Sequence, residues 1–442
     1  MSDPPFPINP DDNPSDSESN FDPFGMLGIP GFDPTQMNLA DLMRLLQSDG
    51  PVNWEIAKQT AEYVAIDGSE EASIPPSTVL ELNELARIAC DYVASETGVT
   101  EVLSAPVKVI GASEWARLHL DSLRLVLETL ATTLSGSLES AQVDDDFGNA
   151  GDGLSFDPSL LPPELAGPLS ALGLNMSGGD PFGGIMKMIA PVLLGTQAGS
   201  MIGSLARNAL GRYDLPLPTT DVPGPTFVVT NLLKFESEWS IEPQDLRLYV
   251  ALHEAVHTSV RCRPWVQSAL ARIANEYVSG FDIDISRIEE QFGGLDPTNP
   301  ASIAAVAEQP DAILGAMRSP RQESSALALR CLVIAMVGYG DAILERLAKP
   351  LLPEFGKIHE AVRRHRVDQG DSGRFVENLL GIRLDRDAVL LGQTFCSGIV
   401  ERAGYLGLHR LWESESMLPT PNELDAPGLW LARIELPDTP SP

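Results

Sequence analysis

Apolar residues recur at steps of three and four along most of this chain, which is the spacing that places side chains on one face of an α-helix. The clearest case is a single apolar stripe within Ser113–Leu134, formed by Leu120, Leu123, Leu127, Leu130 and Leu134. Capping residues and prolines mark where such helices begin and end. The expected helices are one that begins at Asn38, then Trp54–Ala65 behind the cap residue Asn53, Thr78–Ala94, Ser113–Leu134, Ile185–Leu210, Glu242–Arg263, Trp265–Val278, Ala301–Glu308, Ser324–Ala348, Pro353–Val367 and Ala388–Ala403.

Strand-like patterning is confined to one place. Phe227–Thr230 is rich in β-branched and aromatic residues, and Leu232–Phe235 is a candidate continuation of the same patch. The sequence therefore predicts a mainly α fold with a minor β element.

Composition divides the chain into five segments. Residues 1–36 are rich in Asp, Pro, Asn and Ser, and we expect them to be disordered because they carry too little apolar surface to offset the entropy of ordering. Residues 37–134 form an N-terminal helical region. Residues 135–184 contain many glycines and prolines and three consecutive aspartates, which indicates a flexible linker. Residues 185–435 form the main helical domain, and residues 436–442 form a short tail.

The expected helix Ile185–Leu210 contains an uncharged stretch, Met188–Ala206, with Gly195, Gly199 and Gly203 spaced four apart. Glycines at this spacing allow two helix backbones to approach closely, either in a membrane dimer or in a tightly packed soluble core. True membrane spans are usually more apolar and longer. We therefore expect a core helix and no stable membrane insertion.

Charge and cysteine content restrict the partners and the compartment. The 442 residues carry a formal net charge of −32 and a sequence pI near 4.4, so the chain repels phosphates and we expect no nucleic-acid partner. The first fifty residues contain one basic residue, Arg44, and no apolar segment typical of a secretory signal. The four cysteines are widely spaced, which favours reduced thiols and a cytoplasmic protein. Nothing in the sequence fixes the oligomeric state.

One short string carries a recognisable chemistry, namely His253-Glu254-Ala255-Val256-His257, which has the form HExxH. Residues four apart share a helix face, so both imidazoles can bind one Zn²⁺ ion. The glutamate between them lies next to the metal-bound water as a general base. We therefore expect Zn²⁺ as the cofactor, His253 and His257 as ligands, and Glu254 as the catalytic residue. The alternative is an accidental pattern on a helix surface.

A catalytic zinc also needs a third protein ligand. The chain has only six histidines, and the four outside the motif are His119, His359, His365 and His409. Two of these lie in Lys357–Arg366, the one basic run of this acidic chain. That run is either a solvated helix face that pairs with the acidic surface, or a site for an anionic ligand such as the C-terminus of a peptide.

Three sequence blocks carry a family resemblance. They are Gly50-Pro-Val-Asn-Trp54; Leu248-Tyr-Val-Ala-Leu-His-Glu-Ala-Val-His257 followed by Pro264-Trp265; and a C-terminal block with Leu411-Trp-Glu-Ser, Leu418-Pro-Thr420, Glu423-Leu424 and Trp430. In these blocks the chain resembles the type 2 zincin-like metallopeptidase family of actinobacteria, a former domain of unknown function sometimes labelled as associated with coenzyme F420 biosynthesis. With the helices between them, the blocks cover roughly Asn38 to Glu435.

The resemblance implies a mainly helical zincin-like fold, a zinc site of the metallohydrolase type, and a peptide or protein substrate. The family's third zinc ligand is a Glu in a helical E-G-x-x-(D/E) pattern, and the matching stretch here is Val337-Gly338-Tyr339-Gly340-Asp341. Val337 therefore stands at the position of the ligand, and a valine cannot bind zinc. Asp341 occupies a position that orients a ligand histidine in the family, and it is the expected substitute ligand here.

Two functions remain open. The first is a zinc-dependent hydrolase, in which Glu254 activates water on a zinc held by His253 and His257, with Asp341 or another carboxylate completing the site. The second is a catalytically degenerate zincin-like scaffold or interaction protein, which Val337 favours. No Gly-rich phosphate cradle links the chain to F420 chemistry.

Overall fold

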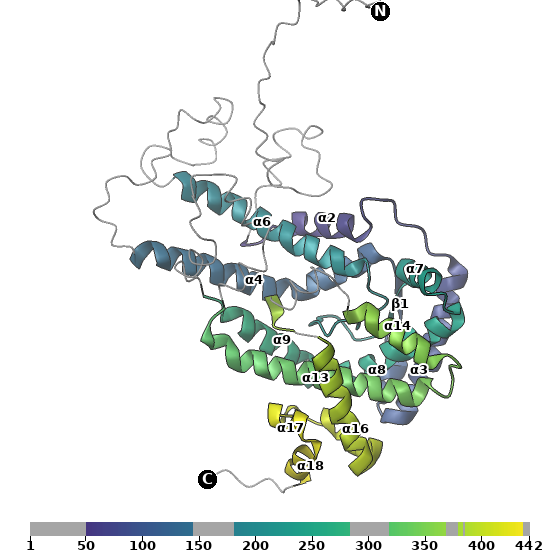
Figure 1. Ribbon diagram of the computed structural model, residues 1–442. Coiled ribbons are helices and arrows are strands. Elements are labelled where there is room, and N and C mark those ends of the chain that lie inside the picture. The colour runs from purple at the N-terminus through teal and green to yellow at the C-terminus, as the bar shows by residue number, and fades with distance from the viewer. Residues whose placement is uncertain (1–49, 145–180, 283–317, 368–378, 383–384, 436–442) are drawn as a thin grey trace, which may run out of the picture.

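The computed structural model describes residues 50–144, 181–282, 318–367, 379–382 and 385–435, and it is mainly α-helical, as predicted (Figure 1). Its longer helices are α2 (Trp54–Ala65), α3 (Pro76–Thr97), α4 (Ala112–Asp144), α6 (Pro181–Ala206), α7 (Val229–Trp239), α8 (Pro243–Arg261), α9 (Pro264–Ser279), α13 (Glu323–Ala348), α14 (Phe355–Val367), α16 (Arg386–His409), α17 (Pro421–Asp425) and α18 (Pro427–Glu435). The 3₁₀ helices are η3 (Thr100–Ser104), η5 (Pro320–Gln322), η6 (Arg410–Trp412) and η7 (Glu415–Met417).

The helix bounds follow the predicted ones closely where the chain is described. Asn53 caps α2 as expected, because its side chain accepts a hydrogen bond from the amide of Ile56 at 3.1 Å. The expected helices at Asn38 and at Ala301–Glu308 lie outside the described residues, as do residues 1–36 and 436–442.

Three boundary predictions are wrong. The expected strand Phe227–Thr230 ends at Val228, because Val229 and Thr230 begin α7. Leu232–Phe235 is not a strand but part of α7, in which Leu232 and Phe235 are three apart and buried on one helix face while Leu233 is exposed. The predicted linker 135–184 is shorter at both ends, since α4 continues to Asp144 and α6 begins at Pro181. Residues 145–180 lie outside the described part.

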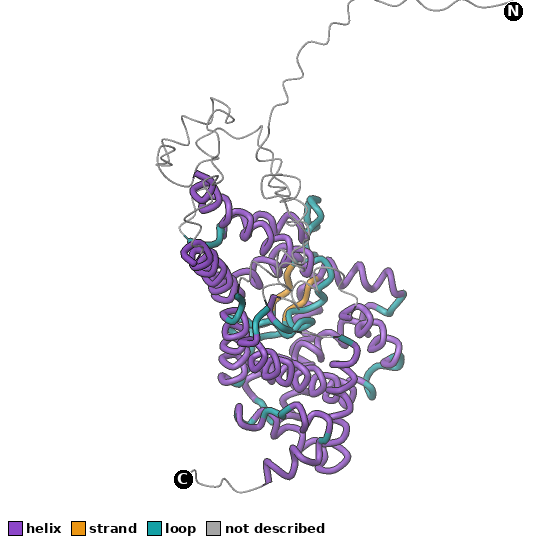
Figure 2. The backbone as a smooth tube through the Cα atoms, turned by 60° about the vertical axis from the view of Figure 1, so that its left-hand side comes forward, coloured by secondary structure: helices purple, strands orange, loops and turns teal. Residues whose placement is uncertain are grey.

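The minor β element is a parallel pair formed by β1 (Lys108–Ile110) and β2 (Thr226–Val228), in which Val109 is opposite Phe227. All three residues of β2 are buried, and the chain passes from β2 directly into α7. Figure 2 shows the two strands side by side, surrounded by helices and loops. The strand at residues 108–110 was not predicted, because three residues are too few to show an alternating pattern.

The glycine stripe of α6 packs against α2 inside the molecule. A Cβ atom on Gly195, Gly199 or Gly203 would lie 2.4, 2.3 or 2.6 Å from a backbone carbonyl oxygen of α2. Such contact is possible only because these positions lack a side chain. Among the described helices, one that includes α13 (residues 320–348) is long and apolar enough to cross a membrane, but 72% of its apolar window is buried within the fold.

Helix α13 lies at the centre of the packing and contacts α8, α9 and α16. It approaches α16 most closely at Gly338, where a Cβ atom would lie 2.4 Å from the carbonyl oxygen of Gly392. Residues from both sides of the undescribed segment 145–180 contribute to one hydrophobic core, which includes the fully buried Trp115, Trp412 and Trp430. The motif helix α8 is therefore held between elements from both halves of the chain.

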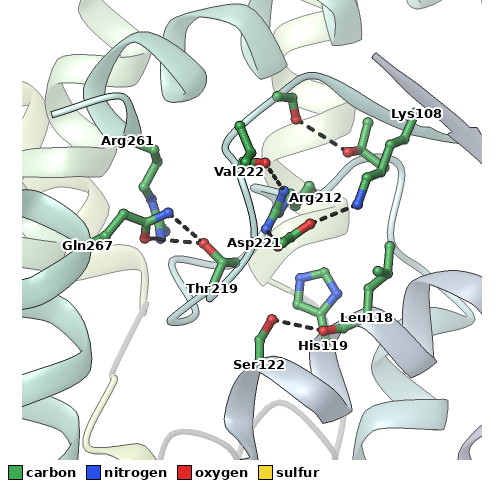
Figure 3. Close-up of polar contacts among 12 residues, drawn as sticks. Lys108, Leu118, His119, Ser122, Arg212, Thr219, Asp221, Val222, Arg261 and Gln267 are labelled. Atoms are coloured by element: carbon green, nitrogen blue, oxygen red, sulfur yellow. Dashed lines mark hydrogen bonds and ion pairs between the residues drawn. The ribbon is translucent and has the colours of Figure 1, made fainter. Parts of the chain in front are cut away.

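Helix α4 carries a buried polar cluster beside the two strands (Figure 3). The His119 ring stacks on Trp115 with ring centroids 3.6 Å apart, and its Nδ1 atom bonds to the Trp115 carbonyl at 3.0 Å. Burial lowers the pKa of His119 from 6.5 to about 4. Its Nε2 atom has no hydrogen-bond partner in the described part of the chain. His119 is therefore buried as a neutral imidazole.

We predict that Gly199→Ala destabilises the protein by about 2–4 kcal/mol, because the added methyl group must push α2 away from α6. The melting temperature should fall by at least about 4 °C in a thermal unfolding experiment. Gly356→Ala is the matched control, since Gly356 is also helical and has no atom within 4 Å of the added Cβ. Equal melting temperatures for both variants would contradict the described packing.

We predict that His119 makes the free energy of unfolding fall as the pH is lowered. Between pH 6.5 and about 4 the unfolded chain binds a proton at His119 that the folded chain does not, so stability is lost across that window. Urea unfolding at pH 7.5 and pH 5 should show that the wild type loses about 2 kcal/mol more than His119→Phe, which keeps the stacked ring and cannot titrate. Parallel losses in the two proteins would show that His119 is not held neutral.

Candidate metal centre

The HExxH motif lies in α8, and it is buried. Pro243 occupies the first turn of the helix, where its missing N–H has no cost. Every residue of α8 from Tyr249 to Arg261 is buried, because α3, α7, α13 and β2 pack around the helix. His253 is 2% exposed, Glu254 is 0% exposed and His257 is 6% exposed. The motif is therefore not an accidental pattern on a helix surface.

The two motif histidines lie one turn apart with their ring centroids separated by 4.5 Å. Burial lowers the pKa of His257 to about 3 and the pKa of His253 well below its ordinary value of 6.5. Both imidazoles are therefore neutral near pH 7, which is the form that binds a metal ion. The Nε2 atom of His253 has no hydrogen-bond partner among the described residues.

After burial, the groups that most affect these two histidines are cationic. Arg366 of α14 lowers the pKa of both histidines, and Arg261 lowers that of His257 further. The Arg366 side chain is only 10% exposed, and its Nε atom lies 3.5 Å from a carboxylate oxygen of Asp214. Guanidinium groups of this kind remain charged at neutral pH.

The basic run therefore has two faces. Lys357 and Arg364 are exposed and form ion pairs with Glu354 and Glu360, which are three and four residues away in the chain. Local pairs of this kind are expected of a solvated helix face. Arg366, at the end of the same run, is directed into the core beside the motif. Arg366 could not be distinguished from its exposed neighbours by its position in the sequence.

The carboxylate of Glu254 is bound by the protein backbone. Its Oε1 atom accepts a hydrogen bond from the amide of Tyr213 at 3.0 Å, and its Oε2 atom accepts from the amides of Arg212 and Thr226, both at 3.1 Å. Burial and the neighbouring Asp214 raise the pKa of Glu254 to about 8, while the three amide donors act in the opposite direction. These three backbone partners could not be predicted from the sequence.

Helix α13 lies directly against the motif, as the family pattern implied. A Cβ atom on Gly340 would lie 2.6 Å from the Nε2 atom of His257. Val337 lies one turn earlier on α13 and is partly buried against the core. Asp341 is buried and accepts a hydrogen bond from Gln393 at 3.3 Å. Burial raises the pKa of Tyr249 and lowers that of His359, and the charge of Asp341 adds to the first effect and opposes the second. Asp341 therefore interacts with Gln393 of α16, Tyr249 of α8 and His359 of α14.

The other candidate histidines have partners elsewhere. The ring nitrogens of three of them bond to the Tyr249 hydroxyl, the Asn208 carbonyl and the Tyr339 hydroxyl; these are His359, His365 and His409 respectively. Within the described residues, no group of three or more His, Cys, Asp or Glu side chains is arranged to hold a metal ion.

The sequence matches the model of a known protein family. The family model described as "Zincin-like metallopeptidase" matches residues 52–431. The chain belongs to this zincin-like metallopeptidase family. The match covers most of the chain and includes both α8 and α13, and zincin-like proteins typically bind zinc.

One solved structure adds a likeness of fold. It is a protein from Chloroflexus aurantiacus described as "a putative hydrolase with a novel fold". The TM-score is 0.56 at 18% identity, and the alignment covers 87% of this chain and 99% of that one. At this identity the likeness concerns the fold alone. No curated protein matches the sequence.

The residues around the motif fit the zinc of this family only in part. Two neutral, adjacent imidazoles, one with a free Nε2 atom, suit a metal ion. A catalytic zinc also needs a third protein ligand and an open position for water. In the described part of the chain α13 meets His257 at Gly340, which has no side chain, and Glu254 is engaged by three amides. The assignment of His253, His257 and Asp341 as ligands and of Glu254 as the base stays a prediction.

We predict that Val337→Glu increases zinc retention, because position 337 lies one turn from Gly340 on the α13 face that contacts His257. The measurement is zinc per chain after gel filtration, together with a competition titration against a chelator. Val337→Gln is the control, since it has the same size and is a much weaker ligand. Unchanged zinc binding accompanied by a lower melting temperature would show that the new carboxylate is buried without a metal within reach.

Proposed function

We propose that this protein is a non-catalytic member of the zincin-like metallopeptidase family, which keeps the fold as a scaffold for binding a peptide or protein. The observation that carries the proposal is the charge environment of the motif histidines. Besides burial, which lowers both pKa values most, Arg366 lowers the pKa of both histidines and Arg261 lowers that of His257. A catalytic zinc centre instead commonly pairs its histidines with carboxylates.

Electrostatics and packing both support this proposal. A divalent cation beside two guanidinium groups in a buried site is repelled, and little water is present to screen the repulsion. Arg366 is balanced in part by Asp214. Arg261, however, donates only to the Leu217 carbonyl and the Gln267 side chain, and no described carboxylate lies within ion-pair distance of it.

The expected partner follows from the family and the charge. Peptidase folds bind extended peptides, so a peptide or protein partner is the best supported class. The net charge of −32 disfavours nucleic acid. All four cysteines are free, which supports the cytoplasm as the compartment. The scaffold function and the cytoplasmic localisation are parts of the same proposal.

A second candidate function is a zinc-dependent hydrolase. Two observations favour it, namely the neutral histidine pair with the free Nε2 atom of His253, and a pKa of about 8 for Glu254, which is close to the pH at which a general base works. In this candidate, His253, His257 and Asp341 or another carboxylate would hold zinc, which would supply an activated water, and Glu254 would serve as the general base.

Metal analysis and a peptidase assay separate the two candidates. We predict that the wild type, incubated with excess zinc and passed through gel filtration, retains well under one zinc ion per chain. It should also cleave a mixed peptide library no faster than His253→Ala does. His409→Ala is the control for the loss of a partly buried histidine outside the motif, because His409 bonds to Tyr339 instead.

The opposite result would establish the hydrolase. It would consist of about one zinc ion per wild-type chain, a zinc-dependent cleavage activity, and the loss of both in His253→Ala but not in His409→Ala. The scaffold proposal would then be wrong.

A further inference from the structure

A proline-rich segment crosses the motif helix. Residues 211–226, which we call the strap, connect the region after α6 to β2, and they include four prolines. At its start, the carbonyl of Gly211 accepts a hydrogen bond from the Trp115 indole at 2.8 Å, and Gly211 forms an isolated bridge with Phe227. Most of the strap is buried, although it has almost no regular structure.

The strap is attached to α8 at three backbone amides. The amides of Arg212 and Tyr213 near its start, and of Thr226 at its end, all donate to the carboxylate of Glu254. One buried side chain therefore closes both ends of a sixteen-residue segment on the motif helix. Farther along, the Leu217 carbonyl accepts a hydrogen bond from Arg261, two turns after Glu254, at 3.0 Å.

The strap packs beside the second motif histidine. The Tyr213 ring lies 6.1 Å from the His257 ring, measured between centroids, and is 3% exposed. The guanidinium groups of Arg212 and Arg261 lie 5.6 Å and 5.3 Å from the centre of the same ring. Figure 3 shows Arg212, Thr219 and Asp221 of the strap facing Arg261 and His119 from the flanking helices. Tyr213 is thus buried next to His257 and close to two cations.

We propose that Glu254 is a latch that holds the strap closed against α8 beside His257. The inference rests on the non-catalytic function proposed above, and it assigns a structural function to Glu254, the glutamate of the motif. A general base needs one carboxylate oxygen free to face water. Here both oxygens of Glu254 are occupied by backbone donors, and the side chain has no exposure.

The geometry specifies a carboxylate at this position. A carboxyl group with both oxygens as acceptors can receive three N–H donors, whereas the glutamine amide turns an N–H₂ group toward at least one of them. The close approach of the strap also requires Gly211, because a Cβ atom there would lie 2.3 Å from the Oε1 atom of Glu254. Glu254→Gln and Gly211→Ala therefore open the same latch by different means.

The experiment is amide hydrogen exchange on the full chain, measured for peptides that cover residues 210–228. In Glu254→Gln and in Gly211→Ala, exchange at the amides of Arg212, Tyr213 and Thr226 should be at least about tenfold faster than in the wild type, since the hydrogen bonds from these amides to Glu254 are lost or weakened. Glu236→Gln is the control, because Glu236 is a buried carboxylate that pairs only with Arg247 outside the strap.

Each outcome decides the proposal. Faster exchange confined to the strap in both latch variants, with the strap unchanged in Glu236→Gln, supports it. If the strap amides of Glu254→Gln exchange at the wild-type rate, the proposal is wrong. It is also overturned by a uniform rise over the whole chain in Glu254→Gln with no change in Gly211→Ala, which indicates general destabilisation. Zinc-dependent cleavage by the wild type would refute the proposed function and leave the exchange result standing.

Discussion

The complete burial of the second half of α8 is the constraint on which the rest of this structure depends. From Tyr249 to Arg261 every residue of the helix is buried, so its polar side chains depend on partners inside the protein. Glu254 accepts from backbone amides, Tyr249 bonds to His359, and Arg261 donates to a carbonyl and an amide side chain. Among the described residues, the Nε2 atom of His253 and the hydroxyl of Thr258 have no such partner, and the Nδ1 atom of His253 lies 3.5 Å from a carboxylate oxygen of Glu254.

Close helix contacts produce that burial. Glycines allow α6 to lie on the backbone of α2, α13 to lie on α16, and α13 to press against His257. The last of these contacts explains why the α13 side of the motif has little room for a ligand group. Gly340 places backbone where a side chain would otherwise stand, and Val337, one turn earlier, adds apolar surface. Packing density and metal-binding capacity therefore oppose each other at this interface.

Much of the fold could be predicted from the sequence because helical periodicity is a local signal. The stripes of α4, the cap of α2, the glycines of α6 and the place of the motif within a helix all followed from spacing. The family pattern also led correctly to the stretch of α13 that meets His257. The partners of Glu254 could not be predicted, because they are backbone amides. Every residue except proline has such an amide, and the residue type does not indicate which acceptor the amide will bond to. Arg366 was likewise indistinguishable from the exposed cations of its run.

The parallel strand pair has a consequence for the order of folding. Its strands come from distant parts of the chain, with Lys108 opposite Thr226, and three residue pairs contribute little enthalpy against the entropy of closing so long a loop. We therefore expect the helices to assemble first and the strands to join late. Thr226 also supplies one of the amides bound by Glu254, so the glutamate acquires its last partner in that same late step. In this order of folding, we expect the helix that bears the motif to form before Glu254 acquires its last hydrogen bond, and the motif to be more open at that stage than in the finished fold.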